Sequence, residues 1–221
     1  MAAMAVMRKG FWMRLPSLPV VLIVLAAACI LPEAAIHLFP YPDLVRGRLI
    51  QNFAFWPGLV KGWHANYPGQ AELMFLSYGF LHAGVTHLLF NMITLISLGR
   101  PLAEELGQGK FLLLYLLAQL GGGAGYALLT TQTAPMVGAS GALFGLAGAL
   151  LWTRLREGLR DLTPVEALRD IAWPVALLIG MNVVMYVALD GRLAWETHLG
   201  GFLAGAAAMA VLWRRPDDAS A

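Results

Sequence analysis

Four polar residues lie inside apolar stretches of this chain. Ser140 stands in the stretch Gly-Ala-Ser-Gly at the start of one hydrophobic segment, and His198 stands at the start of another. His87 and Asn91 lie four residues apart in a third segment. Polar side chains are rare and costly in such segments, and they mark functional sites. A serine, a histidine and two hydrogen-bonding side chains are the groups that an acyl-transfer site needs: a nucleophile, its base and donors to an oxyanion.

The composition predicts the environment in which these residues must be positioned. The 221 residues are 59% hydrophobic and 13% charged, with a mean hydropathy of +0.67, whereas soluble domains carry about 25% charged residues. We therefore expect an all-α, polytopic membrane protein with one helical domain. The formal net charge of +2 gives no reason to expect a nucleic-acid partner. The single cysteine, Cys29, can form no internal disulfide and is interpreted as a small core residue.

A membrane-spanning helix needs about 20 mainly apolar residues. The apolar stretches that meet this length predict six spans, over residues 18–37, 77–99, 109–130, 136–153, 171–189 and 194–213. The first stretch is longer than the apolar region of a signal peptide, so we interpret it as an uncleaved span. The expected organisation is a cytoplasmic N-terminal segment (1–17), a six-helix membrane domain (18–213) and a cytoplasmic tail (214–221).

The distribution of Lys and Arg predicts the orientation. With the N-terminus inside, the outer segments hold only Arg46, Arg48, Lys61 and Arg192, and all other Lys and Arg residues fall in inner segments. The positive-inside rule then places both termini in the cytoplasm. Spans two, four and six run inward, so the four polar residues all lie in the outer half of the membrane. The aromatic-rich segment 38–76 is expected to form short helices at the outer interface, and 154–170 to form a solvated inner loop.

Glycines predict how the polar residues meet. Small residues four positions apart let membrane helices approach closely, and they occur at Gly141 and Gly145 in span four and at Gly201 and Gly205 in span six. His198 shares a helix face with the second pair, because it lies three and seven residues before its members. We therefore expect spans four and six to pack through glycine and to bring Ser140 within hydrogen-bond reach of His198.

The residue types suggest a role for each group. A serine hydroxyl becomes a good nucleophile only when a base such as neutral imidazole takes its proton. No carboxylate is well placed as a third member, since Glu196 points to the other side of its helix, so a Ser–His dyad is predicted. His87 and Asn91 share a face and can donate hydrogen bonds to an oxyanion, together with the backbone N–H of Ser140. His82 lies about 140° around the helix from His87 and is interpreted as a structural residue.

With these residues in place, the chain resembles the rhomboid intramembrane serine proteases. The matching motifs are His82-x4-His87-x3-Asn91, Gly138-x-Ser140-Gly141 and His198-x2-Gly201-x3-Gly205, in the order and membrane topology of that family. The resemblance implies a six-helix core with Ser140 as nucleophile and His198 as general base. It also implies an oxyanion hole of His87, Asn91 and the backbone of Ser140.

The resemblance extends to supporting residues and to substrates. It implies that Gly138 shapes the approach to the serine and that Phe144 stacks on the catalytic histidine. Substrates would be single-pass membrane proteins, cut near the outer end of their membrane helix without a cofactor. The expected location is a bacterial inner membrane. The chain departs from many family members at Leu73 and Met74, where a Trp-Arg pair is common, and at Thr197, where Ala is usual.

Three other interpretations predict different features. A metal site could use His82, His87 and His198, but the first two do not share a helix face. A rhomboid-like protein that binds membrane clients without cutting them would lack the serine or the histidine, and both are present. A transporter would need a polar route through the membrane, whereas the inner halves of spans two, four and six are almost wholly apolar.

Overall fold

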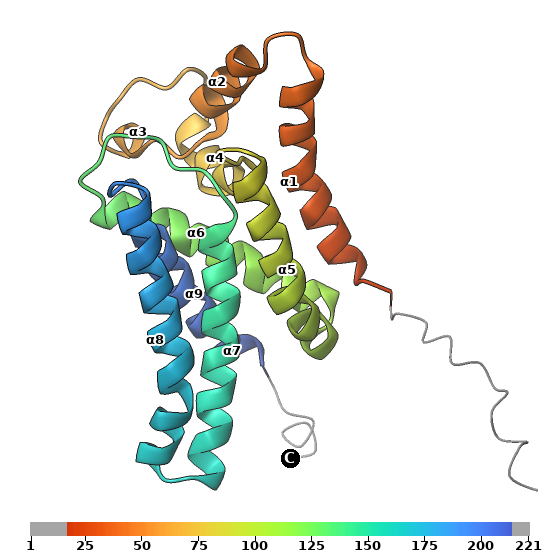
Figure 1. The fold of residues 1–221 in the computed structure, drawn as a ribbon, viewed down its shortest axis with the longest axis vertical. Coiled ribbons are helices and arrows are strands. Elements are labelled where there is room, and N and C mark those ends of the chain that lie inside the picture. Colours follow the sequence, from red (N-terminus) through yellow and green to blue (C-terminus); the bar gives the residue numbers. More distant parts are fainter. Residues whose placement is uncertain (1–16, 214–221) are drawn as a thin grey trace, which may run out of the picture.

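The computed structural model describes residues 17–213, which form helices and connecting segments without a β-strand (Figure 1). The elements are α1 (Val20–Leu38), α2 (Pro42–Phe53), α3 (Pro57–Val60), α4 (Gln70–Ser77), η1 (Tyr78–Phe80), α5 (Val85–Leu106), α6 (Gln108–Leu129), α7 (Ser140–Asp161), α8 (Pro164–Ala188) and α9 (Trp195–Leu212). The predicted all-α class is confirmed for this part of the chain. The cytoplasmic segments predicted at the two ends lie almost entirely outside the described residues.

The centre of the bundle is made by α6, α7 and α9, which pack against one another more extensively than any other elements. Glycine allows this contact. A Cβ atom built on Gly201 would overlap the backbone of Gly141, and one built on Gly205 would overlap the backbone of Gly145. Gly200 makes the same backbone contact with Gly121 on α6. The predicted glycine packing of α7 against α9 is therefore present, and it brings the two helix starts together.

A second layer of packing joins α1 and α5 to this centre. Leu22 and Leu25 of α1, Leu95 and Leu102 of α5, and Phe111 of α6 are buried in one apolar cluster. The helix α8 differs from the others, because it packs mainly against α7 and leaves most of its apolar side chains exposed. Apolar surfaces of this extent are expected where lipid rather than water surrounds a helix.

Segment 38–76 contains the short helices α2, α3 and α4, as predicted. A pair of backbone hydrogen bonds between Phe55 and Met136 joins this segment to the loop that precedes α7. Arg46 of α2 forms an ion pair with the buried Glu33 of α1 and also donates a hydrogen bond to the carbonyl oxygen of His82. These contacts fix the turn between η1 and α5, where the backbone is not helical.

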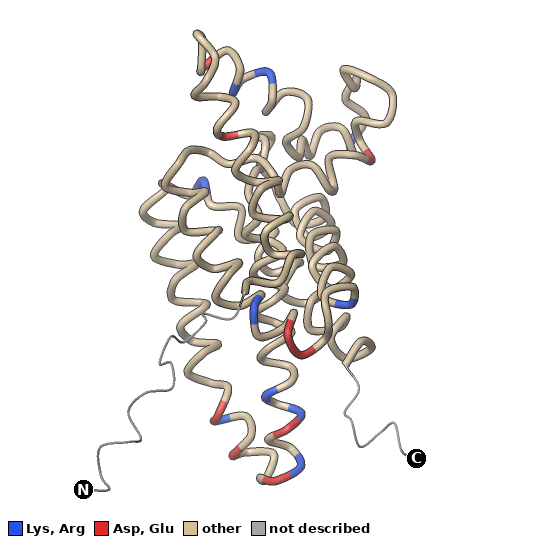
Figure 2. Tube along the Cα trace, turned by 90° about the vertical axis from the view of Figure 1, so that its right-hand side faces the viewer, with Lys and Arg blue, Asp and Glu red and all other residues tan. Residues whose placement is uncertain are grey.

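Within the described residues, three helices are long and apolar enough to cross a membrane on their own: α1, α6 and α8. A fourth candidate span is the pair formed by Gln70–Phe80 and α5, which bends by 82° at the break. The helices α7 and α9 carry polar residues that lower their hydropathy: charged residues in the last turns of α7, and Glu196 and His198 at the start of α9. Figure 2 shows most charged residues toward the two ends of the molecule, with an uncharged stretch between them.

Several predicted boundaries are wrong. Predicted span two is broken at Leu81–Gly84, and its main helix extends to Leu106, past the predicted end at residue 99. The predicted inner loop 154–170 is mostly helix, because α7 continues to Asp161 and α8 begins at Pro164. A capping box between Thr163 and Glu166 stabilises the early start of α8. Charged residues can continue a helix past its apolar segment. The charged residues of 154–170 therefore did not mark where α7 ends and α8 begins.

Candidate active site

The side chains of Ser140 and His198 lie within hydrogen-bond distance at the end of the bundle where α7 and α9 begin. Ser140 is the first residue of α7, and His198 lies in the first turn of α9. The Nε2 atom of His198 is 2.9 Å from the Oγ atom of Ser140. His198 is buried at 8% exposure, and Ser140 is partly buried. This arrangement is that of a nucleophile and its general base.

Two further side chains contact the His198 ring. Phe144, one turn after Ser140 on α7, stacks on it with ring centroids 4.2 Å apart and planes inclined by 8°. The Oδ1 atom of Asn182, on α8, lies 2.6 Å from His198 Nδ1. The stacking agrees with the geometry implied for Phe144, whereas Asn182 was not predicted. Its signal was available, because an amide in the apolar stretch 171–189 breaks the same pattern that marked the other four residues.

His87 lies over Gly138, next to the serine. A Cβ atom on Gly138 would come within 2.7 Å of His87 Cε1 and 2.9 Å of Nε2, and 3.8 Å from Ser140 Oγ. Gly138 has φ +126°, a conformation that side chains rarely adopt, so glycine is required for both space and backbone. The N–H of Ala83 points at Nδ1 of His87 at 3.4 Å. This contact leaves the proton on Nε2, the nitrogen that faces Gly138.

The backbone before Ser140 is fixed from outside the bundle. The N–H of Gly138 donates to the carbonyl oxygen of Tyr78 at 3.0 Å, and the bonds between Phe55 and Met136 hold the residues just before it. The N–H of Ser140 lies in the first turn of α7, where backbone N–H groups have no acceptor within the helix. The start of α7 can therefore present a backbone donor to a substrate oxygen beside the nucleophile.

Asn91 and His82 occupy less direct positions. Asn91 is buried and donates from Nδ2 to the carbonyl oxygen of His87 at 2.8 Å, which leaves the second hydrogen of the same amide nitrogen available. His82 lies in the turn before α5 and is 3% exposed, with its ring against the edge of His87 at a centroid distance of 5.2 Å. Its carbonyl group, bound by Arg46, ties the turn to α2. The structural role of His82 stays a prediction, because the contact with Arg46 is made by the backbone of His82 and not by its ring.

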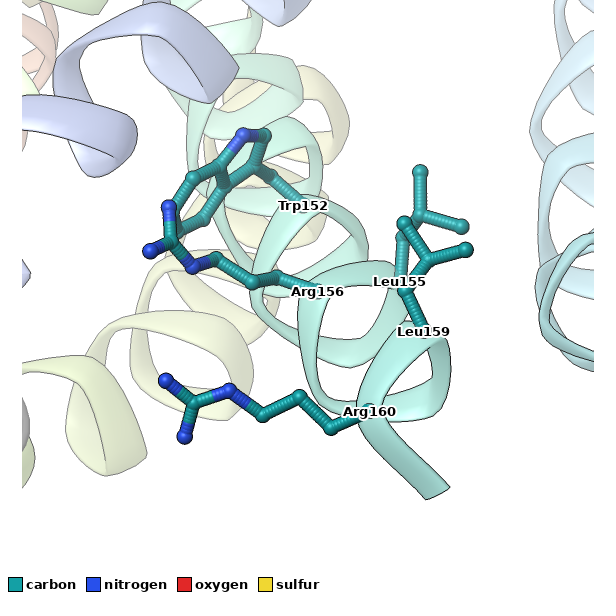
Figure 3. Close-up of a pocket in the computed structure, with 5 residues that line it drawn as sticks. All are labelled: Trp152, Leu155, Arg156, Leu159 and Arg160. Carbon is teal, nitrogen blue, oxygen red and sulfur yellow. The ribbon is translucent and has the colours of Figure 1, made fainter. Parts of the chain in front are cut away.

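The described residues contain no group of three His, Cys, Asp or Glu side chains arranged to hold a metal ion. A pocket of about 420 Å³ lies at the other end of α7, lined by Trp152, Leu155, Arg156, Leu159 and Arg160 (Figure 3). Arg156 lies over the ring of Trp152 there, at 5.3 Å from the centroid. This pocket is separated from Ser140 by most of the length of α7, so it is not part of the candidate active site.

Comparison with known proteins gives a consistent family. The rhomboid domain matches residues 70–215, a range that includes every residue of the candidate site. RHOMBOID-like protein 5 of Arabidopsis thaliana is 38% identical over 139 residues, which are 62% of this chain and 43% of that protein. The rhomboid protease GluP of Bacillus subtilis is 36% identical over 132 residues, covering 60% of this chain and 24% of that protein.

A third relative is similar to this chain in length. The putative rhomboid protease YdcA of B. subtilis is 30% identical over 154 residues, which are 68% of this chain and 72% of that protein. The other two relatives are longer, and the chain spans between about a quarter and a half of their length. The domain match covers more than half of the chain and contains the starts of α5, α7 and α9, which bring the polar residues together. On this evidence the chain belongs to the rhomboid family.

Proposed function

We propose that this chain is an intramembrane serine endopeptidase with Ser140 as nucleophile and His198 as general base. The observation that supports this most directly is the 2.9 Å separation of His198 Nε2 and Ser140 Oγ at the start of two glycine-packed helices. Family membership supports a protease, because relatives in the same family are named as proteases.

The proposed reaction uses these two groups twice. Ser140 Oγ bonds to the carbonyl carbon of the scissile peptide while its proton moves to His198 Nε2, and the carbonyl oxygen becomes an oxyanion. The imidazolium then gives the proton to the leaving nitrogen, the C–N bond breaks and an acyl-enzyme remains. Water attacks the ester with the same histidine as base, which releases the new carboxylate and restores Ser140. No cofactor takes part in this scheme.

The proposed topology determines which class of substrate is expected and where it is cut. Six spans with both termini in the cytoplasm place the candidate site in the outer half of the membrane. A helix in lipid satisfies its backbone hydrogen bonds internally, so its carbonyl groups reach a nucleophile only where it unwinds. We therefore propose cleavage of single-pass membrane proteins near the outer end of their helix. The apolar helices suggest an integral, multi-pass membrane protein. We propose a bacterial inner membrane from the sequence alone. The relatives do not indicate one kind of membrane, because they include plant proteins.

The test of this proposal combines labelling with product analysis. Purified protein in detergent is expected to react with a fluorophosphonate probe at Ser140 and, in liposomes, to cut a single-pass substrate near the outer end of its helix. Mass spectrometry locates both the label and the cut. A protein that binds membrane clients without cutting them would give neither label nor products. Cuts at the cytoplasmic end would contradict the topology.

Loss of one oxyanion donor is expected to slow the reaction strongly. In serine hydrolases one such donor contributes about 10²–10³ in rate, so His87→Ala and Asn91→Ala should each lower kcat by about that factor while Ser140 stays in place. The measurement is the turnover of a fluorogenic transmembrane substrate in liposomes. Ser97→Ala is the matched control, because Ser97 lies on the same helix, is exposed and donates its hydroxyl hydrogen to the backbone carbonyl oxygen of Ile93. Wild-type turnover in both test variants would leave His87 and Asn91 with a structural role only.

A further inference from the structure

The bond between Asn182 and His198 connects α8 to the candidate site. Ser140 comes from α7 and His198 from α9, while Asn182 comes from α8, a helix in which only Ala167 is buried. The Oδ1 atom of Asn182 lies 2.6 Å from His198 Nδ1, on the opposite side of the ring from Ser140. Asn182 is partly buried and is not among the residues that the family motifs of this chain contain.

The orientation of the Asn182 amide follows from its second contact. Its Nδ2 atom donates to the carbonyl oxygen of Leu178, one turn earlier on α8, at 2.9 Å. A carbonyl oxygen can only accept, so the nitrogen of the amide must face Leu178 and the oxygen must face His198. The amide oxygen is itself only an acceptor, and His198 Nδ1 must therefore be the donor. The amide orientation is thus fixed by the hydrogen-bond network of α8 itself.

This assignment determines which nitrogen of His198 can act as base. With the proton on Nδ1, the lone pair of a neutral imidazole lies on Nε2, where it accepts the proton of Ser140. Phe144 holds the plane of the ring by stacking, but stacking does not fix its rotation within that plane. The bond to Asn182 fixes that rotation and selects the tautomer. When the imidazolium forms, the same amide oxygen faces a positively charged N–H group, and the hydrogen bond becomes stronger.

We propose that Asn182 is a positioning residue that holds His198 in the tautomer and orientation required of the general base. The inference rests on the proposed function, and it adds a third residue that acts through the histidine without contacting substrate. An amide supplies no charge, so the arrangement Ser140–His198–Asn182 orients the base without the electrostatic contribution of a carboxylate.

The test compares Asn182→Ala and Asn182→Asp with Met181→Ala, an exposed neighbour on the same helix. Asn182→Ala is expected to lower kcat and the rate of fluorophosphonate labelling by about 10- to 100-fold, with KM nearly unchanged. Asn182→Asp keeps the acceptor and should recover much of the rate, with the acidic limb of its pH–rate profile moved to higher pH because a carboxylate stabilises the imidazolium. Met181→Ala should resemble the wild type.

A spectroscopic measurement separates this inference from the proposed function. In protein labelled with ¹⁵N-histidine, nuclear magnetic resonance is expected to show His198 protonated at Nδ1 in the wild type and a mixture of tautomers in Asn182→Ala. If Asn182→Ala misfolds, as judged by thermal unfolding in detergent, Asn182→Asp and its pH profile test the same point. An unlabelled, inactive wild type would contradict the proposed function, whatever the tautomer. Wild-type kcat, pH profile and tautomer in a folded Asn182→Ala would overturn the inference alone.

Discussion

Replacing Ser140 or His198 by Ala is expected to abolish detectable cleavage of a transmembrane substrate while the fold is kept. In serine proteases, loss of the nucleophile or of its base costs about 10⁶ in kcat, and the 2.9 Å contact between these side chains places both in one reaction. Turnover in liposomes measures the effect. The double variant should be no slower than either single variant. Two residues that act as a unit are already inactive when one is removed, so removing the second has no further effect.

The control for this prediction is a measurement that both variants still fold. Ser140 occupies the first position of α7, where removal of a hydroxyl group leaves the helix intact, and His198→Ala removes a side chain in the first turn of α9. Both proteins should unfold thermally in detergent within a few degrees of the wild type. Ser140→Ala should also lose the fluorophosphonate label. Retained activity in a folded Ser140→Ala or His198→Ala protein would end the proposed mechanism.

Adding one methyl group at Gly205 is expected to disrupt both stability and activity. A Cβ atom at this position would overlap the backbone of Gly145, which cannot move aside as a flexible side chain could. Overpacking in well-packed interiors typically costs about 1–3 kcal/mol, and contact with backbone places Gly205→Ala at the upper end of that range. Separation of α7 from α9 also moves Ser140 away from His198. Thermal unfolding in detergent and substrate turnover should therefore fall together.

A second glycine provides a matched control for this effect. Gly180, within α8, has no atom within 4 Å of the position that a Cβ would take. Gly180→Ala should keep activity and unfold no earlier than the wild type, since alanine is favoured over glycine in helices by about 1 kcal/mol. If Gly205→Ala behaved like Gly180→Ala, the contact between α7 and α9 would not be the element that sets the distance between Ser140 and His198.

Much of the candidate site could be predicted because each of its residues conflicts with its surroundings. A serine, two histidines and an asparagine in apolar stretches are unusual, and glycine spacing indicated which helix faces meet. Helix boundaries were less predictable. Apolar length indicates the part of a helix that lies in lipid, whereas α7 continues to Asp161 through charged turns stabilised by ordinary helix hydrogen bonds. The break before α5 depends on the contact of Arg46 with the backbone of His82, which no local pattern reveals.

Asn182 was missed because the third residue was expected to be a carboxylate, the group that orients the histidine in soluble serine proteases. An amide can provide the same hydrogen-bond acceptor, and in hydrocarbon it avoids the large cost of an ionised group. The sequence did contain the signal, since Asn182 is a polar residue in an apolar stretch. Only the three-dimensional arrangement, in which α8 packs against α7, shows that the oxygen of Asn182 faces His198.

The order of the helices along the chain has a consequence for the protein during its synthesis. Ser140 is synthesised with α7, Asn182 with α8, and His198 only with α9, the last of the described helices. Until α9 has inserted and its glycines have packed against Gly141 and Gly145, the serine has no partner that can take its proton. Under the proposed mechanism, a chain whose α9 has not yet inserted would not react with neighbouring membrane proteins. Completion of the fold and onset of reactivity would then coincide.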